Sequence, residues 1–227
     1  MRSNLTLDPA HTALILIDLQ QEQKTDRHYA VDGIDTVLAN ARALLEAARA
    51  RQLPVIHAAF RRDFDRVPRR PLEHVTAEGR PTFSDKDSPG IAICAEVAPR
   101  AGEPVLYKND ASAFCEGELE PLLKPRGVEW LIVCGVWTEA CVAATVRDAI
   151  AKGIRVLLVK NACGSGTRAM HEIGILNLAN RLAGGAVADT AGAIRLIAGD
   201  AVEVWTPERP VPILFDYADA ANHYHRL

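Results

Sequence analysis

The sequence predicts an α/β fold with a mostly parallel sheet of six strands that helices cover on both faces. Short segments that are apolar throughout alternate with segments whose apolar residues recur at helical spacing. Continuously apolar strands are typical of a parallel sheet buried on both sides. The 227 residues are enough for one domain with an appendage.

Each predicted element follows from its local pattern. The strands are expected at residues 12–18, 53–60, 104–108, 130–136, 154–159 and 186–188. The helices are expected at residues 35–52, 138–152, 167–182 and 190–198, the second of them closed by Gly153.

Two segments fall outside this alternation. Residues 61–90 are rich in Arg, Asp, Pro and Gly and predict a long loop, a kind of segment that often covers a functional site. Residues 200–227 are interpreted as a C-terminal arm beyond a domain of residues 1–199. Because this arm carries Phe215, Tyr217 and Tyr224 with two histidines, we expect it to pack on a partner subunit.

Composition excludes several classes of protein. The net charge of −3 argues against binding to nucleic acid or to an anionic membrane surface. No apolar run approaches the roughly 18 residues that span a bilayer, and the amino terminus does not have the pattern of a secretory signal. The five cysteines are odd in number and form no CxxC pair, so the expected location is the reducing cytoplasm.

Three reactive side chains lie at the ends of predicted strands. Asp18 ends the first strand, Lys108 ends the third, and Cys141 lies at the start of the helix after the fourth. Ligands of open parallel sheets bind at the carboxyl ends of the strands. We therefore expect these three residues to meet at one edge of the sheet, although each alone also fits a turn residue, a solvated strand end or a small buried residue.

The chemistry of the three residues is coherent. A cysteine attacks as thiolate, which the helix start, with Thr138 as its expected N-cap, and the Lys108 ammonium would favour. Asp18 would take the thiol proton and later pass it to a leaving amine. The backbone N–H of Cys141 and one from the preceding turn would hold an oxyanion.

Three motifs in this order resemble the isochorismatase-like cysteine hydrolase family, in its amidohydrolase branch. They are ALILIDLQ at residues 13–20, KNDASAF at 108–114 and GVWTEACVAATVRDA at 135–149. The resemblance implies a Rossmann-like three-layer α/β/α fold and a catalytic triad of Asp18, Lys108 and Cys141. It also implies a non-proline cis peptide between Val136 and Trp137, with the Trp137 and Cys141 N–H groups as oxyanion hole. A homodimer or homotetramer is implied as well.

Departures from relatives narrow the chemistry. Nicotinamidases of this superfamily bind a metal through an Asp-x-His and a further His after the second strand, whereas His57 stands alone here. We therefore expect no metal and no cofactor. Isochorismatases proper lack the cysteine nucleophile, so Cys141 argues against their vinyl-ether chemistry.

The resulting hypothesis is a cysteine hydrolase that cleaves a C–N bond of a small amide or carbamoyl/ureido compound. It would form a covalent thioester and release ammonia or an amine. Two alternatives stay open: the same triad acting on a hydrazide or ester, and a non-catalytic thiol or ligand-binding protein on this fold. The expected substrate-binding residues are Gln20, Phe60, Phe114, Trp137 and Thr138.

Overall fold

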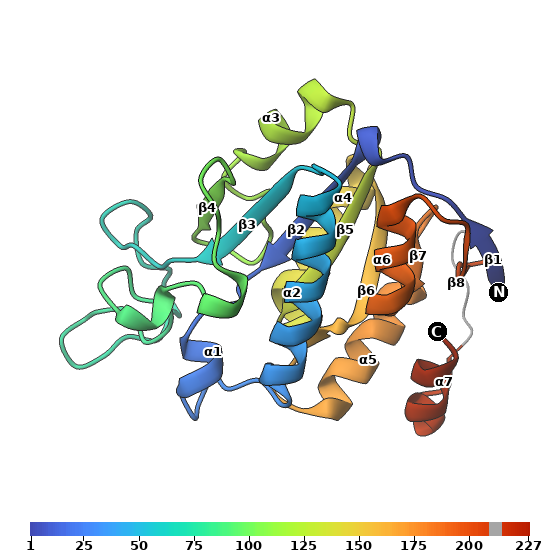
Figure 1. The fold of residues 1–227 in the computed structure, drawn as a ribbon. Helices are drawn as coiled ribbons and strands as arrows, with labels where there is room; N and C mark the ends of the chain where they lie inside the picture. Colours follow the sequence, from blue (N-terminus) through green and yellow to red (C-terminus); the bar gives the residue numbers. More distant parts are fainter. Residues whose placement is uncertain (209–214) are drawn as a thin grey trace.

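The computed structural model describes residues 1–208 and 215–227, and in these residues eight strands form one mixed sheet (Figure 1). The order across the sheet is β1-β8-β7-β6-β5-β2-β3-β4. The strands are β1 (Arg2–Leu5), β2 (Thr12–Ile17), β3 (Val55–Phe60), β4 (Val105–Lys108), β5 (Trp130–Val136), β6 (Arg155–Gly164), β7 (Ala186–Ala188) and β8 (Val202–Trp205). The run from β7 to β4 is parallel, and β8 is antiparallel to both β7 and β1.

The predicted number of six strands is wrong, although all six predicted strands are present. The two additional strands, β1 and β8, are four residues long and lie together at one side of the sheet. β1 is half exposed and lacks an apolar run, which hid it from a search for buried strands. β8 alternates buried Val202 and Val204 with exposed Glu203, a weak period-two signal inside a segment interpreted as an arm.

Helices cover both faces of the sheet, as predicted. α2 (Ile34–Ala50) and α6 (Thr190–Ala198) pack on one face, and α3 (Leu119–Leu123), α4 (Ala143–Ala151) and α5 (Arg168–Ala179) pack on the other (Figure 1). The remaining helical segments are α1 (Glu22–Thr25), α7 (Ala220–Arg226), a π-helical turn at Thr138–Val142, and 3-10 turns at Pro9–His11, Pro89–Ile91, Ala95–Val97, Lys124–Arg126 and Tyr217–Asp219.

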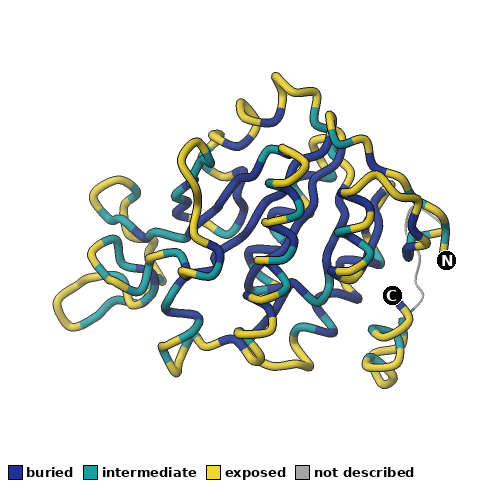
Figure 2. The backbone as a smooth tube through the Cα atoms, in the orientation of Figure 1, coloured by how far each residue is buried: buried dark blue, intermediate teal, exposed yellow. Residues whose placement is uncertain are grey.

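The buried residues follow the central parallel strands, as Figure 2 shows. Side chains of β2 alternate between the two faces: Leu14 and Leu16 join the core under α2, and Ile15 and Ile17 join the core under α4. No helix in the described residues is both long and apolar enough to cross a membrane.

Residues 61–90 form the long loop that the sequence predicts. Only isolated bridges and one short 3-10 turn interrupt it. Its base is held by Arg62, a nearly buried guanidinium whose Nη2 donates to Glu73 Oε2 at 2.7 Å. The loop projects from the sheet edge beside β3 and β4 (Figure 1).

The described parts of the segment after residue 200, residues 201–208 and 215–227, pack on their own chain. β8 joins the sheet, and α7 lies against α5, where Tyr224 Oη is 3.0 Å from His171 Nε2. Residues 209–214 of the predicted arm lie outside the described residues. Packing of the arm on a partner subunit stays a prediction.

Candidate active site

Asp18 and Lys108 form a buried ion pair at the carboxyl ends of their strands. Lys108 Nζ lies 2.8 Å from Asp18 Oδ2 and donates also to the Asp110 carbonyl at 3.2 Å. The two side chains come from β2 and β4, which flank β3. Asp18 is held in a left-handed conformation with φ of 51°, and its N–H bonds the Ala58 carbonyl.

Cys141 lies beside this pair. It belongs to the π-helical turn Thr138–Val142, which follows β5, the strand next to β2. The residue is 7% exposed, and its thiol is close enough to Asp18 and Lys108 to shift the pKa values of both groups. The sheet order thus brings together the three residues that the sequence places at strand ends.

Burial dominates the electrostatics of this group. It raises the pKa of Cys141 far above its usual range, and the negative charge of Asp18 adds to this effect, while Lys108 opposes it. Burial also raises the pKa of Asp18 despite the nearby Lys108 ammonium. Burial thus disfavours the thiolate expected from the sequence, and a base beside the thiol would favour its formation.

Asp18 has an oxygen available for that proton. Oδ2 accepts a hydrogen bond from Lys108 Nζ, whereas Oδ1 is buried and makes no hydrogen bond of good geometry to any described residue. A buried carboxylate with one free oxygen and a raised pKa is a better proton acceptor than an exposed aspartate. The pair is therefore equipped to exchange a proton with a neighbouring thiol.

The strand that leads to Cys141 depends on a glycine. Gly135 has φ of +128°, and a Cβ at this position would lie 2.1 Å from the Ile17 carbonyl oxygen. β5 is therefore able to approach the end of β2 only without a side chain here. This close approach brings the turn after β5 next to Asp18.

The peptide bond between Val136 and Trp137 is cis, which confirms the expectation from the family resemblance. The next residue differs from expectation. Thr138 is not the N-cap, because its hydroxyl donates to the Gly164 carbonyl at 2.9 Å and contacts His171 Nδ1 at 2.8 Å. Trp137 takes the N-cap position, with no side-chain cap.

Gln20 holds the strand ends together. Its amide donates to the carbonyls of Phe60 and Ile91 at 2.9 and 2.8 Å and accepts from the Phe60 N–H at 2.8 Å. The side chain is fully buried. These bonds explain why an amide stands here, and contact of Gln20 with substrate stays a prediction.

Phe60 and Phe114 occupy different surroundings. The Lys108 ammonium lies 4.6 Å from the centre of the Phe60 ring, so Phe60 borders the ion pair. Phe114 is buried in the core with Leu119 and Leu123 of α3, and Lys152 Nζ lies 5.6 Å from the centre of its ring. A role for either ring in binding substrate stays a prediction.

An aromatic cluster, formed by Tyr29, Phe60, Phe83 and Trp137, continues from Phe60. The centre of the Phe83 ring lies 5.3 Å from that of Phe60 and 5.4 Å from that of Trp137, on which it stacks. The centre of the Tyr29 ring lies 4.9 Å from that of Phe83. Tyr29 and Phe83 were not predicted from the sequence, because neither stands in a periodic segment. The only indication in the sequence was the length of the loop at residues 61–90, since loops of this kind often cover a functional site.

The loop is fastened next to Phe83 by a buried carboxyl group. The Glu22 carboxylate accepts hydrogen bonds from the Ser84 hydroxyl and, at 3.2 Å, from the Ser84 N–H. Burial raises the pKa of Glu22, and the Ser84 bonds oppose the shift. The contact fixes the backbone next to Phe83, whose ring stacks on Trp137.

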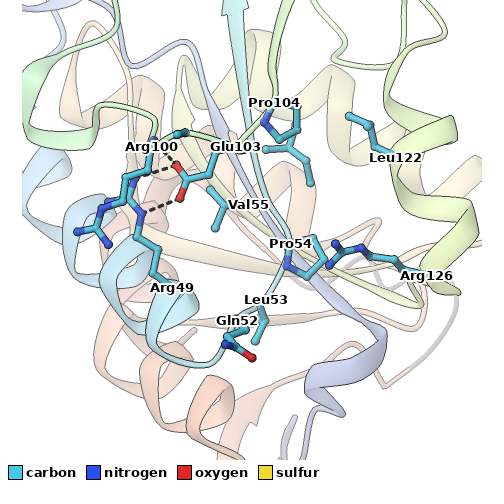
Figure 3. Close-up of a pocket in the computed structure, with 13 residues that line it drawn as sticks. Arg49, Gln52, Leu53, Pro54, Val55, Arg100, Glu103, Pro104, Leu122 and Arg126 are labelled. Atoms are coloured by element: carbon cyan, nitrogen blue, oxygen red, sulfur yellow. Dashed lines mark hydrogen bonds and ion pairs between the residues drawn. The ribbon is translucent and has the colours of Figure 1, made fainter.

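A cavity of about 530 Å³ lies elsewhere, beside the amino ends of β3 and β4 (Figure 3). Arg49 and Arg100 line it together with Glu103, whose carboxylate accepts from Arg49 Nε at 2.7 Å. His57 lies in β3, as predicted, and its ring is 3.1 Å from the same carboxylate. Asp18, Lys108 and Cys141 do not line this cavity, so it is separate from the candidate active site.

Comparison with known proteins identifies the family of the chain. The family model described as Isochorismatase domain matches residues 12–192 of the chain. Maleamate amidohydrolase of Pseudomonas putida is 32% identical over 170 residues, which cover 73% of this chain and 78% of that protein. N-carbamoylsarcosine amidase of an Arthrobacter species is 31% identical over 172 residues, covering 74% and 65%.

A solved structure supports the fold. An isochorismatase family protein from Desulfovibrio vulgaris superposes with a TM-score of 0.74 at 29% sequence identity. The match covers 83% of this chain and 98% of that chain.

Proposed function

The chain belongs to the isochorismatase family of hydrolases, and we propose that within this family it is a cysteine amidohydrolase. Its substrate would be a small amide or a carbamoyl or ureido compound. The observation that carries the proposal is the buried Lys108–Asp18 pair with the Cys141 thiol beside it. The relatives named maleamate amidohydrolase and N-carbamoylsarcosine amidase support this choice of bond.

The first half of the reaction forms a thioester. Asp18 accepts the thiol proton, and the Cys141 sulfur attacks the carbonyl carbon of the substrate. The carbonyl oxygen becomes an oxyanion, which the backbone N–H groups of Trp137 and Cys141 stabilise. The C–N bond then breaks, and Asp18 returns its proton to the leaving nitrogen, so that ammonia or an amine departs.

The second half hydrolyses the thioester. Asp18 takes a proton from water, the resulting hydroxide attacks the acyl carbon, and the C–S bond breaks. The proton returns to the sulfur, which restores the neutral thiol and releases a carboxylic acid from an amide substrate or a carbamic acid from a carbamoyl or ureido substrate. Lys108 keeps its positive charge throughout, because a negative charge on Asp18 or on Cys141 raises its pKa against the effect of burial.

Substrate turnover by matched variants tests the proposal. We expect the wild-type protein to release ammonia from at least one member of a panel of maleamate, N-carbamoylsarcosine and ureidoacrylate. Cys141→Ala and Asp18→Asn should abolish release while circular dichroism shows folded protein. Cys115→Ala removes an exposed thiol and should retain activity.

A hydrazide and a methyl ester of the same acids, tested in the same assay, distinguish an amidohydrolase from an enzyme that prefers another leaving group. Faster turnover of the ester or hydrazide than of every amide would reassign the substrate class. Retained turnover in Cys141→Ala would exclude covalent catalysis by this residue.

A further inference from the structure

A chain of hydrogen bonds connects the C-terminal helix to the nucleophile turn, defined as Thr138–Val142. The Thr138 hydroxyl lies 2.9 Å from the Gly164 carbonyl oxygen and 2.8 Å from His171 Nδ1. His171 Nε2 in turn lies 3.0 Å from Tyr224 Oη. Four segments of the fold, α7, α5, the turn and the end of β6, are joined in this way.

Chemistry fixes the direction of these bonds. The Gly164 carbonyl only accepts, so the Thr138 hydroxyl must donate to it and offers a lone pair to His171. His171 Nδ1 therefore carries the hydrogen, and Nε2 accepts from the Tyr224 hydroxyl. This neutral tautomer agrees with burial, which lowers the pKa of His171 to about 4.

Packing makes α5 a firm support for the turn. Gly174, one helical turn after His171, is so close to Thr138 that a Cβ there would lie 3.0 Å from Thr138 Cγ2. Ser165 adds a bond from its hydroxyl to Glu139 Oε1 at 2.8 Å. A shift of His171 would therefore move the first residues of the nucleophile turn.

Tyr224 is itself well fastened. Lys160 Nζ donates to the Tyr224 carbonyl at 2.8 Å and lies 4.8 Å from the centre of its ring. The Tyr224 and His171 rings meet edge to face at 5.3 Å. The hydroxyl is thus directed at His171 by contacts that do not involve the hydroxyl.

We propose that Tyr224 is a positioning residue for the nucleophile turn, acting through His171 and Thr138. The inference rests on the proposed function, since the turn carries Cys141 and the N–H groups assigned to the oxyanion. The Tyr224 side chain contacts His171 and Lys160 and would act on the turn only through His171. Its hydroxyl fixes the His171 ring, and the ring fixes Thr138.

The same segment offers a matched control. Tyr217 precedes α7, and its hydroxyl bonds Asn177, also on α5. Tyr217→Phe therefore removes a hydroxyl contact between the C-terminal segment and α5 that lies outside the relay. Tyr224→Phe removes the relay hydroxyl and keeps the ring that packs on Lys160 and His171.

Two readouts test the proposal on the full-length protein. The first is kcat and KM for an amide of the panel, and the second is the rate at which iodoacetamide alkylates Cys141, followed by peptide mapping. We expect Tyr224→Phe to lower kcat and to change the alkylation rate by about three- to tenfold, with KM within about twofold of wild type. Tyr217→Phe should match wild type in both.

A double-variant cycle tests the route. In a Thr138→Val background the additional change Tyr224→Phe should have little further effect, because the relay is already interrupted. Equal behaviour of Tyr224→Phe and Tyr217→Phe, or additive effects in the cycle, would overturn the proposal. If the wild type hydrolyses no amide, the proposed function fails, and the alkylation rates still decide whether the relay exists.

Discussion

Lys108 Nζ and Asp18 Oδ2 lie 2.8 Å apart, and both side chains are almost wholly removed from solvent. Burial of two charges is costly, and their attraction offsets this cost only while both partners are present. Two apolar side chains at these positions would stabilise the strand ends at least as well. The pair therefore points to chemistry, and its removal should separate stability from activity.

Lys108→Met should destabilise the protein by about 3–5 kcal/mol, because it leaves the Asp18 carboxylate buried without its partner. The double variant Lys108→Met/Asp18→Asn removes both charges and should regain part of this free energy of unfolding. Neither variant should release ammonia. Urea denaturation and the amide assay measure the two effects, and activity in the double variant would contradict a role for the pair in catalysis.

Gly135→Ala should prevent folding or cost more than about 3 kcal/mol, since the added Cβ would meet the Ile17 carbonyl oxygen at 2.1 Å. Gly153→Ala is the matched control, because Gly153 also has a positive φ but nothing among the described residues lies within 4 Å of its Cβ. The control should cost about 1–2 kcal/mol. Similar unfolding free energies for the two variants would show that the close approach of β5 and β2 is not required.

Glu73→Gln should loosen the loop of residues 61–90. Glu73 holds the buried Arg62 in a two-pronged contact, and the Arg62 guanidinium lowers the pKa of Glu73 to about 2. Trypsin should cleave the loop about tenfold faster in this variant. Glu78→Gln changes an exposed carboxylate of the same loop and should be cleaved at the wild-type rate, and a wild-type rate for Glu73→Gln would exclude the clamp.

Stability should fall in mild acid, partly through His171. Burial lowers the pKa of His171 from 6.5 to about 4, so the unfolded chain binds a proton that the folded chain excludes between these values. The contribution of neutral His171 to the free energy of unfolding is complete above pH 6.5 and is lost as the pH falls towards 4. The expected loss is about 2 kcal/mol between about pH 7.5 and about pH 5.

His171→Gln should remove this part of the pH dependence of the unfolding free energy. The part due to His57 should persist, because burial lowers the pKa of that histidine too. Glu172, Arg168 and Lys160 act on His171 as well, so each unfolding curve is compared at the same two pH values. An unchanged slope in His171→Gln would show that His171 does not carry the effect.

The reactive residues could be predicted because the sheet itself groups them. Asp18 follows β2, Lys108 ends β4 and Cys141 lies in the turn after β5, and parallel strands place such ends along one edge. The family motifs at the same positions strengthened that prediction, and the cis bond before Trp137 followed from them. None of this required knowledge of a side-chain contact.

Other features depend on contacts between distant segments. Thr138 has the residue type of an N-cap, but its hydroxyl is taken by Gly164 and His171, from elements later in the chain. Phe83 reaches Trp137 from a loop without periodicity. No local pattern reports either contact, so they appear only when the chain is folded.

The most direct test of the account is to trap the thioester. Wild-type protein mixed with a turned-over amide and quenched in acid within the first turnovers should gain the mass of the acyl group, and peptide mapping should place it on Cys141. Cys141→Ala should show neither the adduct nor ammonia release. Ammonia release by Cys141→Ala, or an acyl group mapped to another residue, would contradict the account.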